Sequence, residues 1–464
     1  MGEWTGFRSS QLRVFKNGRK TDYKPSMKLL TYNLKIKLTG LACLSILLYL
    51  LIVRFDLEHD DVVLIKDLKV CKTNMATEAI VRVENSKAFL VSAYLDERFS
   101  RMLRIISIVD RASRLKFYCH FCNGSRVTSA KAKVEVQSNH FNFPYGSANI
   151  LCQVPGEAGV VSSVSVSTEQ KSYPRTPFLP IRSIKKVGGR AAYLRNFTVC
   201  ISTLFGNYSN VLQFMQSLEM YRILGAQKVL IYKSDCSSLI QKVLDYYTAE
   251  GMVEVIAWNI HHHLNVSKSW KPSIDPGDLH YYGQVAALND CVYRNMATSR
   301  YVVLNDIDEV VVPVLHRNWI DMMHYLSLGH MGVESFLFEN NVFRHRIVGD
   351  DGKFDLWPHV PGVNILRHVH REPLKLLTFN ARKMIVNPRA VVWTSVHMVW
   401  EQMGATLLVP ASVARLQHCR SDDDLLVQDS ELIRDTNLWK FSTALIRNVN
   451  QISSRILESY PANK

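Results

Sequence analysis

The pattern of apolar and polar positions changes along the chain. Between residues 76 and 155, short segments such as 103–109 and 133–136 alternate apolar with polar positions, which is the period of a β-strand with one buried face. Further on, apolar runs such as 197–204 are followed by stretches such as 207–224, whose apolar positions recur every three to four residues. The pattern therefore predicts a small β-rich domain followed by a larger domain of strands and helices.

The larger domain is predicted to contain a mostly parallel sheet. Gly225 and Gly251 directly follow the two predicted helices, where glycine commonly ends a helix. Strand–helix–strand units connect through right-handed crossovers and place helices on both faces of the sheet. Ligands of such sheets bind at the carboxyl ends of the strands, so functional residues are expected there. The alternating elements are predicted at 197–204, 207–224, 228–232, 239–250 and 253–258.

The remaining segments differ in composition from the two domains. Residues 1–37 form a basic tail, 38–53 an uncharged apolar run and 54–75 a short charged stem. Residues 156–192 are rich in Ser, Gly, Pro and Lys, which predicts an extended connection. The second domain is accordingly predicted over 193–445.

The apolar run predicts a membrane anchor. As a helix, its sixteen residues would span about 24 Å, against about 30 Å for a typical hydrocarbon core. The first 37 residues contribute +7 to a formal charge of +15, and basic flanks stay on the cytosolic side. A cleaved signal peptide is the alternative, although its charged region would be unusually long. The sequence therefore predicts a single-pass type II protein of the Golgi or endoplasmic-reticulum membrane, with its folded part in the lumen.

The cysteines agree with an oxidising compartment. Of nine cysteines, Cys43 lies in the apolar run, and the other eight allow up to four disulfides. Cys119 and Cys122 have the spacing of a redox or zinc half-site, but no second pair of this kind exists, which favours structural disulfides. Sequons for N-glycosylation occur at Asn123, Asn196, Asn207 and Asn265.

Composition and missing motifs exclude several classes of protein. With 47% hydrophobic and 21% charged residues, the chain is neither collagen-like nor largely disordered. Its excess positive charge is concentrated in the tail rather than in a stripe, so no nucleic-acid binding is predicted. The sequence lacks Walker A, Gly-x-Gly-x-x-Gly and Gly-x-Ser-x-Gly motifs, which argues against P-loop, Rossmann and serine-hydrolase functions.

The clearest candidate chemistry follows a predicted strand that ends at Leu304. Asp306 and Asp308 are two apart, so in extended backbone both carboxylates point the same way while Ile307 turns into the core. Paired carboxylates at a strand end suit a hard divalent ion such as Mn²⁺ or Mg²⁺, which offsets the charge of a diphosphate leaving group. A solvated acidic turn is the alternative interpretation.

The residues around this pair resemble glycosyltransferase family 92, a group of secretory-pathway galactosyltransferases. The resemblance covers roughly residues 90 to 425 and is most specific between Gln284 and Pro313. Similar segments occur at 93–98, 199–204, 218–225, 229–232, 282–291, 306–313, 383–388, 396–397 and 416–420.

The resemblance implies a GT-A type nucleotide-sugar transferase domain with flanking helices. It implies transfer of galactose or a related hexose from a UDP-sugar, with UDP-galactose as donor, to a glycan acceptor with inversion. It also implies Mn²⁺ (or Mg²⁺) at Asp306 and Asp308. In GT-A enzymes a downstream histidine often completes the metal site, and His397 and His418 are the candidates. Either histidine could instead cap a strand or donate to a buried carbonyl.

Further residues are expected to bind the donor. Gln284, Asn289 and Asp290 lie on a predicted helix just before the acidic strand, where the resemblance implies contacts with sugar hydroxyls. Lys383 is expected to neutralise the diphosphate or to coat an edge strand. Arg420 is expected to contact a phosphate. It follows Cys419, where the family more often has Tyr.

An inverting transfer also needs a carboxylate base to deprotonate the acceptor hydroxyl. Glu309, Glu339 and Glu401 are the candidates, and Glu309 is grouped with Asp306 and Asp308 as a catalytic residue. A catalytically inactive luminal glycan-binding or scaffold protein with the same fold is the competing interpretation. A phosphate-ester hydrolase that uses the same carboxylates is a third.

Overall fold

The computed structural model describes residues 63–65, 74–124, 126–184, 193–349, 352–375, 378–421 and 427–457. The basic tail, the anchor predicted at 38–53 and most of the stem lie outside the described residues. Among the residues that are described, no helix is both long and apolar enough to cross a membrane.

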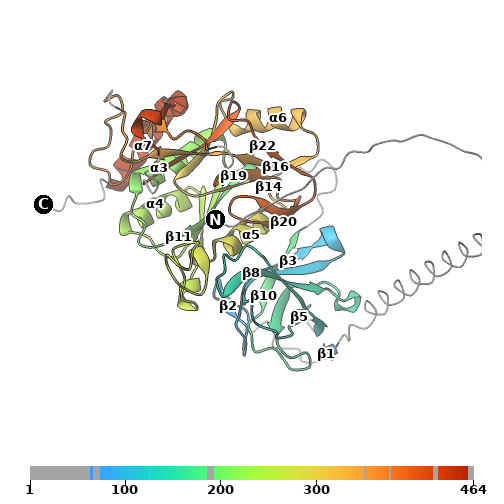
Figure 1. The fold of residues 1–464 in the computed structure, drawn as a ribbon. Coiled ribbons are helices and arrows are strands. Elements are labelled where there is room, and N and C mark those ends of the chain that lie inside the picture. Colours follow the sequence, from blue (N-terminus) through green and yellow to red (C-terminus); the bar gives the residue numbers. More distant parts are fainter. Residues whose placement is uncertain are drawn as a thin grey trace, which may run out of the picture. The chain divides into compact units, whose positions relative to one another are not determined.

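The amino-terminal part is a sheet that has ten strands within the described residues (Figure 1). The strands follow the order β1-β6-β5-β9-β10-β3-β4-β8-β7, and β2 pairs with β3. Neighbours are antiparallel except for β10 and β3, which are parallel. The strands are β1 (Val63–Ile65), β2 (Val81–Arg82), β3 (Ala88–Asp96), β4 (Met102–Asp110), β5 (Tyr118–Cys122), β6 (Val127–Lys131), β7 (Lys133–Val136), β8 (Tyr145–Gln153), β9 (Ser163–Ser167) and β10 (Leu179–Ile184).

Strands β9 and β10 differ from the prediction, because they lie in the segment expected to be an extended connection. Val164 and Val166 of β9 are fully buried in the core of this sheet. The Ser-Val-Ser-Val run therefore supplies an apolar side chain at every second position, although its serine content resembles that of a linker. The segment after Ile184 is described again only from residue 193.

The carboxyl-terminal part contains a second, seven-stranded sheet of described strands. Its first four strands are parallel, β19 is antiparallel to both neighbours, and β22 is parallel to β16. The fold is thus a mixed α/β fold with several sheets, in which the predicted parallel order holds for one half of this sheet. In spatial order the strands are β13 (Val253–Ala257), β12 (Lys228–Lys233), β11 (Arg195–Leu204), β14 (Ser299–Asn305), β19 (Lys383–Val386), β16 (Val333–Phe338) and β22 (Ala405–Leu408).

The predicted helices between these strands are present. α3 ends at Leu224, and Gly225 follows in the left-handed conformation with φ 106°, as expected of a glycine cap. Its first residue is Val211, four residues later than the pattern predicted. The helices of this part are α3 (Val211–Leu224), α4 (Ser238–Ala249), α5 (Gln284–Asn295), α6 (Trp319–Gly329) and α7 (Ser442–Leu457). The last helix extends beyond residue 445, where the domain was predicted to end.

The two faces of the seven-stranded sheet are covered differently. In β11, Val199 points into the core that also contains residues of α3, α4, α6 and α7, whereas Cys200 points into the core that contains α5. The second core also includes Phe89 of β3 and Ile106 of β4. The ten-stranded sheet and α5 therefore share one core on this face (Figure 1).

A five-stranded sheet is connected to the central one through the segment that follows β14. β15 follows β14 after three residues and pairs with β23, which in turn pairs with β17. The strands are β15 (Glu309–Pro313), β23 (Ala414–Arg420), β17 (Asn340–Arg344), β18 (His370–Arg371) and β24 (Ile433–Arg434). A separate hairpin consists of β20 (Val391–Thr394) and β21 (Val399–Gln402).

Disulfides connect distant parts of the chain. Cys119 pairs with Cys152, so the Cys119–Cys122 spacing does not form a redox or zinc half-site. Cys200 of β11 pairs with Cys291 of α5. Cys122 is also disulfide-bonded, whereas Cys236 and Cys419 are free thiols. The prediction of structural disulfides is therefore confirmed for the five bonded cysteines among the described residues, and the two free thiols take no part in the predicted set.

The Cys200–Cys291 bond is expected to stabilise the packing of α5 against the sheet. Because it joins residues 91 positions apart, replacing both cysteines with Ala should lower the free energy of unfolding by about 2–4 kcal/mol. Urea denaturation of the full-length protein in detergent measures this loss. Cys236→Ala is the control, since that thiol closes no loop; equal losses in the two variants would contradict the assignment.

Candidate active site

The acidic pair occupies the connection between two sheets. β14 ends at Asn305 in the central sheet, and β15 begins at Glu309 in the five-stranded sheet. Ile307 is buried in the core, while the side chains of Asp306 and Asp308 are 39% and 32% exposed. This is the arrangement that two-residue alternation predicts. Both carboxylates are accessible to a ligand at the carboxyl end of a parallel strand.

Glu309 lies behind the two aspartates. Its side chain is only 1% exposed, and its Oε2 atom accepts a hydrogen bond from the Asp306 backbone N–H at 2.9 Å. The hydroxyl of Tyr221 on α3 donates to the backbone oxygen of Glu309 at 2.7 Å. Burial raises the pKa of Glu309 to about 7. The residue therefore fixes the connecting turn from inside the protein.

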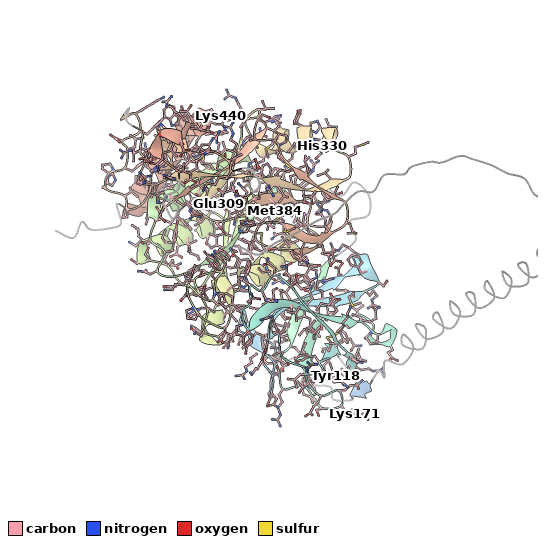
Figure 2. All side chains as sticks on the ribbon, viewed as in Figure 1. Tyr118, Lys171, Glu309, His330, Met384 and Lys440 are labelled. Carbon is pink, nitrogen blue, oxygen red and sulfur yellow. A yellow bond between two sulfur atoms is a disulfide. The ribbon has the colours of Figure 1, made fainter. Side chains whose placement is uncertain are left out.

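Lys383 approaches the same turn from the neighbouring strand. β19 pairs with β14, which brings its first residue, Lys383, beside the end of β14. The ammonium lies 2.6 Å from Asp306 Oδ2 and 3.5 Å from Glu309 Oε2. Figure 2 labels Glu309 and also Met384, which follows Lys383 in β19. Burial alone would lower the pKa of Lys383, but the charges of Asp306 and Glu309 raise it, so the side chain is cationic.

His418 approaches from the five-stranded sheet. It lies opposite Glu309 in the pairing of β23 with β15. Its Nε2 atom is 3.2 Å from Asp308 Oδ2, and its Nδ1 atom is 3.1 Å from the side-chain amide of Asn340. Burial opposes protonation, but the carboxylates of Asp308 and Glu309 raise the pKa of His418. Burial alone would raise the pKa of Asp308, but the positive charge of His418 outweighs it, so the pKa of Asp308 is lowered.

His397 lies near this cluster but bonds elsewhere. It occupies the turn between β20 and β21, and its Nδ1 atom is 3.0 Å from the backbone oxygen of Arg382. Burial and the positive charge of Lys383 lower the pKa of His397 to about 4, so the imidazole is neutral near pH 7. In its present position it binds a backbone carbonyl, which was the structural alternative for this residue.

The donor atoms at this site fit a divalent ion in part. Asp308 Oδ2 and His418 Nε2 are 3.2 Å apart, close to the spacing of about 3 Å between adjacent ligands with bonds of about 2.1 Å to one ion. Asp306 is instead paired with Lys383. Over the described part of the chain, no three His, Cys, Asp or Glu side chains are grouped as they would be around a metal ion. Asp306 could join such an ion only if Lys383 moved to another anion.

The comparison with known proteins identifies the family. Residues 195–461, more than half of the chain, match the sequence model of glycosyltransferase family 92. The chain belongs to glycosyltransferase family 92. The match includes β11, the acidic turn, Lys383 and His418, so the family resemblance of the sequence is confirmed.

Individual relatives are distant. A beta-1,4-galactosyltransferase of Caenorhabditis elegans is 25% identical over 49% of this chain and 52% of its own length. A glycosyltransferase family 92 protein of the same organism is 26% identical over 50% of this chain and 44% of its own. The chain thus spans about half the length of these curated relatives. A crystal structure of a mycobacterial protein covers 58% of this chain at 11% identity with a TM-score of 0.24, too low to support an argument.

Two of the residues expected to bind the donor are buried in α5 of this family 92 domain. Asn289 exchanges hydrogen bonds with the backbone of Thr394, with its amide donating at 2.9 Å and its oxygen accepting at 3.0 Å. Asp290 accepts hydrogen bonds from Tyr94 and Tyr232, each at 2.6 Å, and from Ser92. Both side chains thus already have protein partners.

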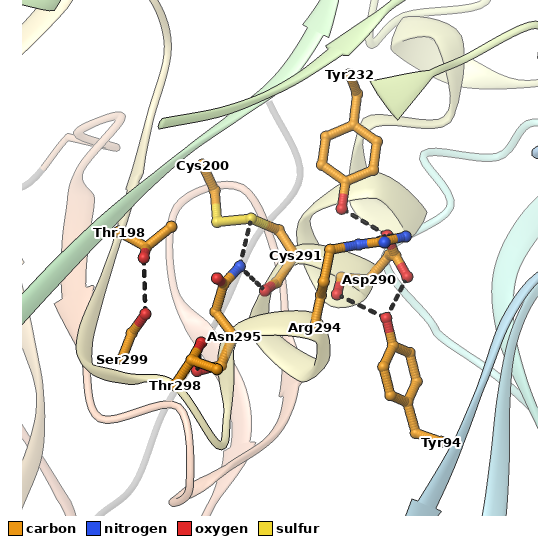
Figure 3. Close-up of a disulfide and its surroundings, with 10 residues drawn as sticks. All are labelled: Tyr94, Thr198, Cys200, Tyr232, Asp290, Cys291, Arg294, Asn295, Thr298 and Ser299. Carbon is orange, nitrogen blue, oxygen red and sulfur yellow. Dashed lines mark hydrogen bonds and ion pairs between the residues drawn. A yellow bond between two sulfur atoms is a disulfide. The ribbon is translucent and has the colours of Figure 1, made fainter. Parts of the chain in front are cut away.

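Asp290 joins the two large sheets. Ser92 and Tyr94 lie on β3 of the ten-stranded sheet, Tyr232 lies on β12 of the central sheet, and Arg294 forms an ion pair with Asp290 at 2.9 Å (Figure 3). Burial would raise the pKa of Asp290, but Arg294 and the hydroxyl donors lower it, so the carboxylate is ionised. This arrangement indicates a structural role.

Gln284 and Arg420 lie closer to the strand ends. Gln284 is the first residue of α5, and its side-chain amide donates to Ser202 Oγ of β11 at 3.0 Å. Arg420 is the last residue of β23, two residues after His418. Its positive charge works to lower the pKa of His418, but the carboxylates of Asp308 and Glu309 have the larger, opposite effect. Cys419, between His418 and Arg420, is buried, and its backbone N–H donates to the backbone oxygen of Asp308 at 3.2 Å.

Two residues at the site were not predicted from the sequence: Tyr221 contacts the acidic turn, and Asn340 contacts His418. Asn340 follows the apolar run Phe336–Phe338 as part of a polar triplet, Glu339–Asn341. A polar triplet at the end of an apolar strand was thus an available signal. Tyr221 offered no such signal, because its ring faces the core like its helical neighbours.

Proposed function

We propose that this protein transfers galactose from UDP-galactose to a glycan acceptor, with inversion and with Mn²⁺ as cofactor. The observation that carries the proposal is the exposed pair Asp306 and Asp308 at the end of β14, in a chain that belongs to family 92. The name of the galactosyltransferase relative supports the choice of hexose. The GT-A type of the domain is part of the same proposal.

In the proposed reaction, the acceptor hydroxyl attacks the anomeric carbon on the face opposite UDP. The new carbon–oxygen bond forms as the bond to the diphosphate breaks, and the acceptor proton passes to a carboxylate base. A divalent ion held by Asp306, Asp308 and His418 would supply positive charge for the departing diphosphate. Lys383, released from Asp306, would add an ammonium to the same phosphates.

The three candidate bases differ in burial and neighbours. Glu309 is buried under the aspartates and hydrogen-bonded to the Asp306 backbone, so its proposed role is to position them. Glu339 is 26% exposed, lies 3.9 Å from Arg382 and directly precedes Asn340. Glu401 is exposed on β21. We propose Glu339 as the base because it adjoins the residues that contact His418 and Lys383.

The proposed location follows from the sequence. Residues 38–53 would anchor the chain as a type II protein in the Golgi or endoplasmic-reticulum membrane, with the family 92 domain in the lumen. The disulfides of the described residues support an oxidising compartment.

The decisive experiment measures UDP release from UDP-galactose by the full-length protein in detergent, with a panel of glycan acceptors. We expect release that depends on Mn²⁺, falls to background with EDTA and returns when Mn²⁺ is restored. Full activity in EDTA would remove the metal from the proposal. Binding of glycans without any UDP release would instead support the inactive glycan-binding protein.

A further inference from the structure

Two buried polar atoms near the acidic pair have no hydrogen-bond partner. They are the hydroxyl of Tyr208 and the side-chain oxygen of Asn340. Buried polar atoms in folded proteins nearly always have a partner, so an unpaired one needs an explanation. One explanation is a ligand that supplies the missing partners. Substitutions at these two residues can test it.

Tyr208 lies in the turn between β11 and α3. Its backbone oxygen accepts a hydrogen bond from Ser237 at 3.0 Å, and its ring lies 6.1 Å from that of Phe214. Burial, and then the negative charge of Asp308, raise the pKa of Tyr208. The hydroxyl thus keeps its proton. Tyr208 follows the carboxyl end of β11, which lies beside the end of β14 because Ile201 of β11 is opposite Asn305. The hydroxyl is a donor that lacks an acceptor.

Asn340 lies beside His418, the hydrogen-bond partner of Asp308. Its backbone N–H and oxygen are both bonded to the side chain of Asn380, at 2.8 and 3.2 Å, which fixes the start of β17. Its amide nitrogen contacts His418, and its oxygen has no partner. If the amide were turned round, the nitrogen would be the unpaired atom. A hydroxyl group, which both donates and accepts, satisfies either orientation.

Arg382 carries a third polar atom without a hydrogen-bond partner. Its buried Nε atom also has no partner, and the residue directly precedes Lys383. The unpaired atoms of these three residues belong to a phenol, a guanidinium and an amide. Phosphate oxygens only accept, whereas hexose hydroxyls also donate. A ligand that carries both kinds of group matches this set.

We propose that Tyr208 and Asn340 form the two ends of a subsite for a nucleoside diphosphate hexose. Tyr208 donates to a phosphate oxygen, and Asn340 bonds a hydroxyl of the hexose. The subsite deepens the proposed function and rests on it. It also replaces Asn289 and Asp290 as sugar contacts, since those side chains are already occupied by protein partners.

The first test is Tyr208→Phe, measured by calorimetry with UDP and Mn²⁺ on the full-length protein. A hydroxyl without a partner contributes nothing to folding, so the melting temperature should stay at the wild-type value. The dissociation constant for UDP should rise about tenfold, as expected for one lost hydrogen bond to a charged group. Tyr247→Phe is the matched control: its hydroxyl donates to Glu219 at 2.8 Å, so it should lower the melting temperature and leave UDP binding unchanged.

The second test separates the hexose from the phosphates. Asn340→Ala should weaken UDP-galactose about tenfold more than it weakens UDP, because an effect that acts through His418 and the metal is common to both ligands. Equal weakening of both ligands would place Asn340 at the phosphates and overturn its assignment to the hexose.

The remaining outcomes distinguish this inference from the function on which it rests. If the wild type binds UDP and Tyr208→Phe binds it equally well, the subsite is wrong while the donor stands. If the wild type binds neither UDP nor UDP-galactose, the donor and the subsite fail together. A lower melting temperature for Tyr208→Phe would show that the hydroxyl has a protein partner, which also overturns the inference.

Discussion

Asp308→Asn is expected to lower the rate of UDP release from UDP-galactose by about 10²–10³-fold or more, because it removes a charge that the transition state of diphosphate departure requires. The isosteric change keeps the shape of the turn and one hydrogen-bonding oxygen toward His418. Its side chain is 32% exposed, so folding should be little affected. Steady-state kinetics in Mn²⁺, with melting temperatures alongside, measures both quantities.

Mn²⁺ binding provides a readout that does not depend on turnover. In calorimetric titration without donor, Asp308→Asn should bind Mn²⁺ much more weakly than the wild type. Asp321→Asn is a suitable control, since that exposed carboxylate lies in the first turn of α6, where it accepts a hydrogen bond from Asn318, and should change neither quantity. Wild-type turnover and metal affinity in Asp308→Asn would refute the metal site.

Much of the fold of the second domain could be predicted because its signals are local. The alternation in β11 and the spacing in α3 follow from residues within one element, and Gly225 ends the helix as expected. The same local rule predicted that Asp306 and Asp308 share one side while Ile307 is buried. Local patterns failed where composition masked periodicity, as in β9, whose serines resemble a linker.

The partners of the site residues could not be predicted, because they depend on register between distant strands. Lys383 meets Asp306 only because β19 pairs with β14 in one register, 77 residues apart. His418 meets Asp308 through the pairing of β23 with β15. Nothing around Asp290 in the sequence indicates that Ser92 and Tyr94, almost 200 residues earlier, supply its hydrogen bonds.

Asp290→Asn is expected to lower the free energy of unfolding by about 3–5 kcal/mol, because it leaves the guanidinium of Arg294 without its counter-charge in a mostly buried position. Asn keeps an oxygen that can accept from Tyr94, but its amide nitrogen replaces the Oδ2 atom that accepts from Tyr232 and Arg294, so the loss reports the charge together with these bonds. Urea denaturation of full-length protein at pH 7 measures it. Among molecules that remain folded, the KM for UDP-galactose should match the wild type, since Asp290 bonds only to protein groups.

The loss should depend on pH with a definite sign. Because the pKa of Asp290 is lowered in the folded protein, its carboxylate contributes stability above the unfolded-state pKa of about 3.9 and loses that contribution as the pH falls further. The difference between wild type and Asp290→Asn should therefore be constant from about pH 5 to 7 and shrink below about pH 4.

The double variant Asp290→Asn with Arg294→Met tests whether the unpaired charge of Arg294 causes the loss of stability. Removing both charges leaves no unpaired ion, so the double variant should regain a large part of the stability lost in the single one. A double variant no more stable than Asp290→Asn alone would show that the hydroxyl bonds from β3 and β12, rather than the ion pair, depend on the carboxylate. A raised KM for UDP-galactose in the folded single variant would return Asp290 to the donor site.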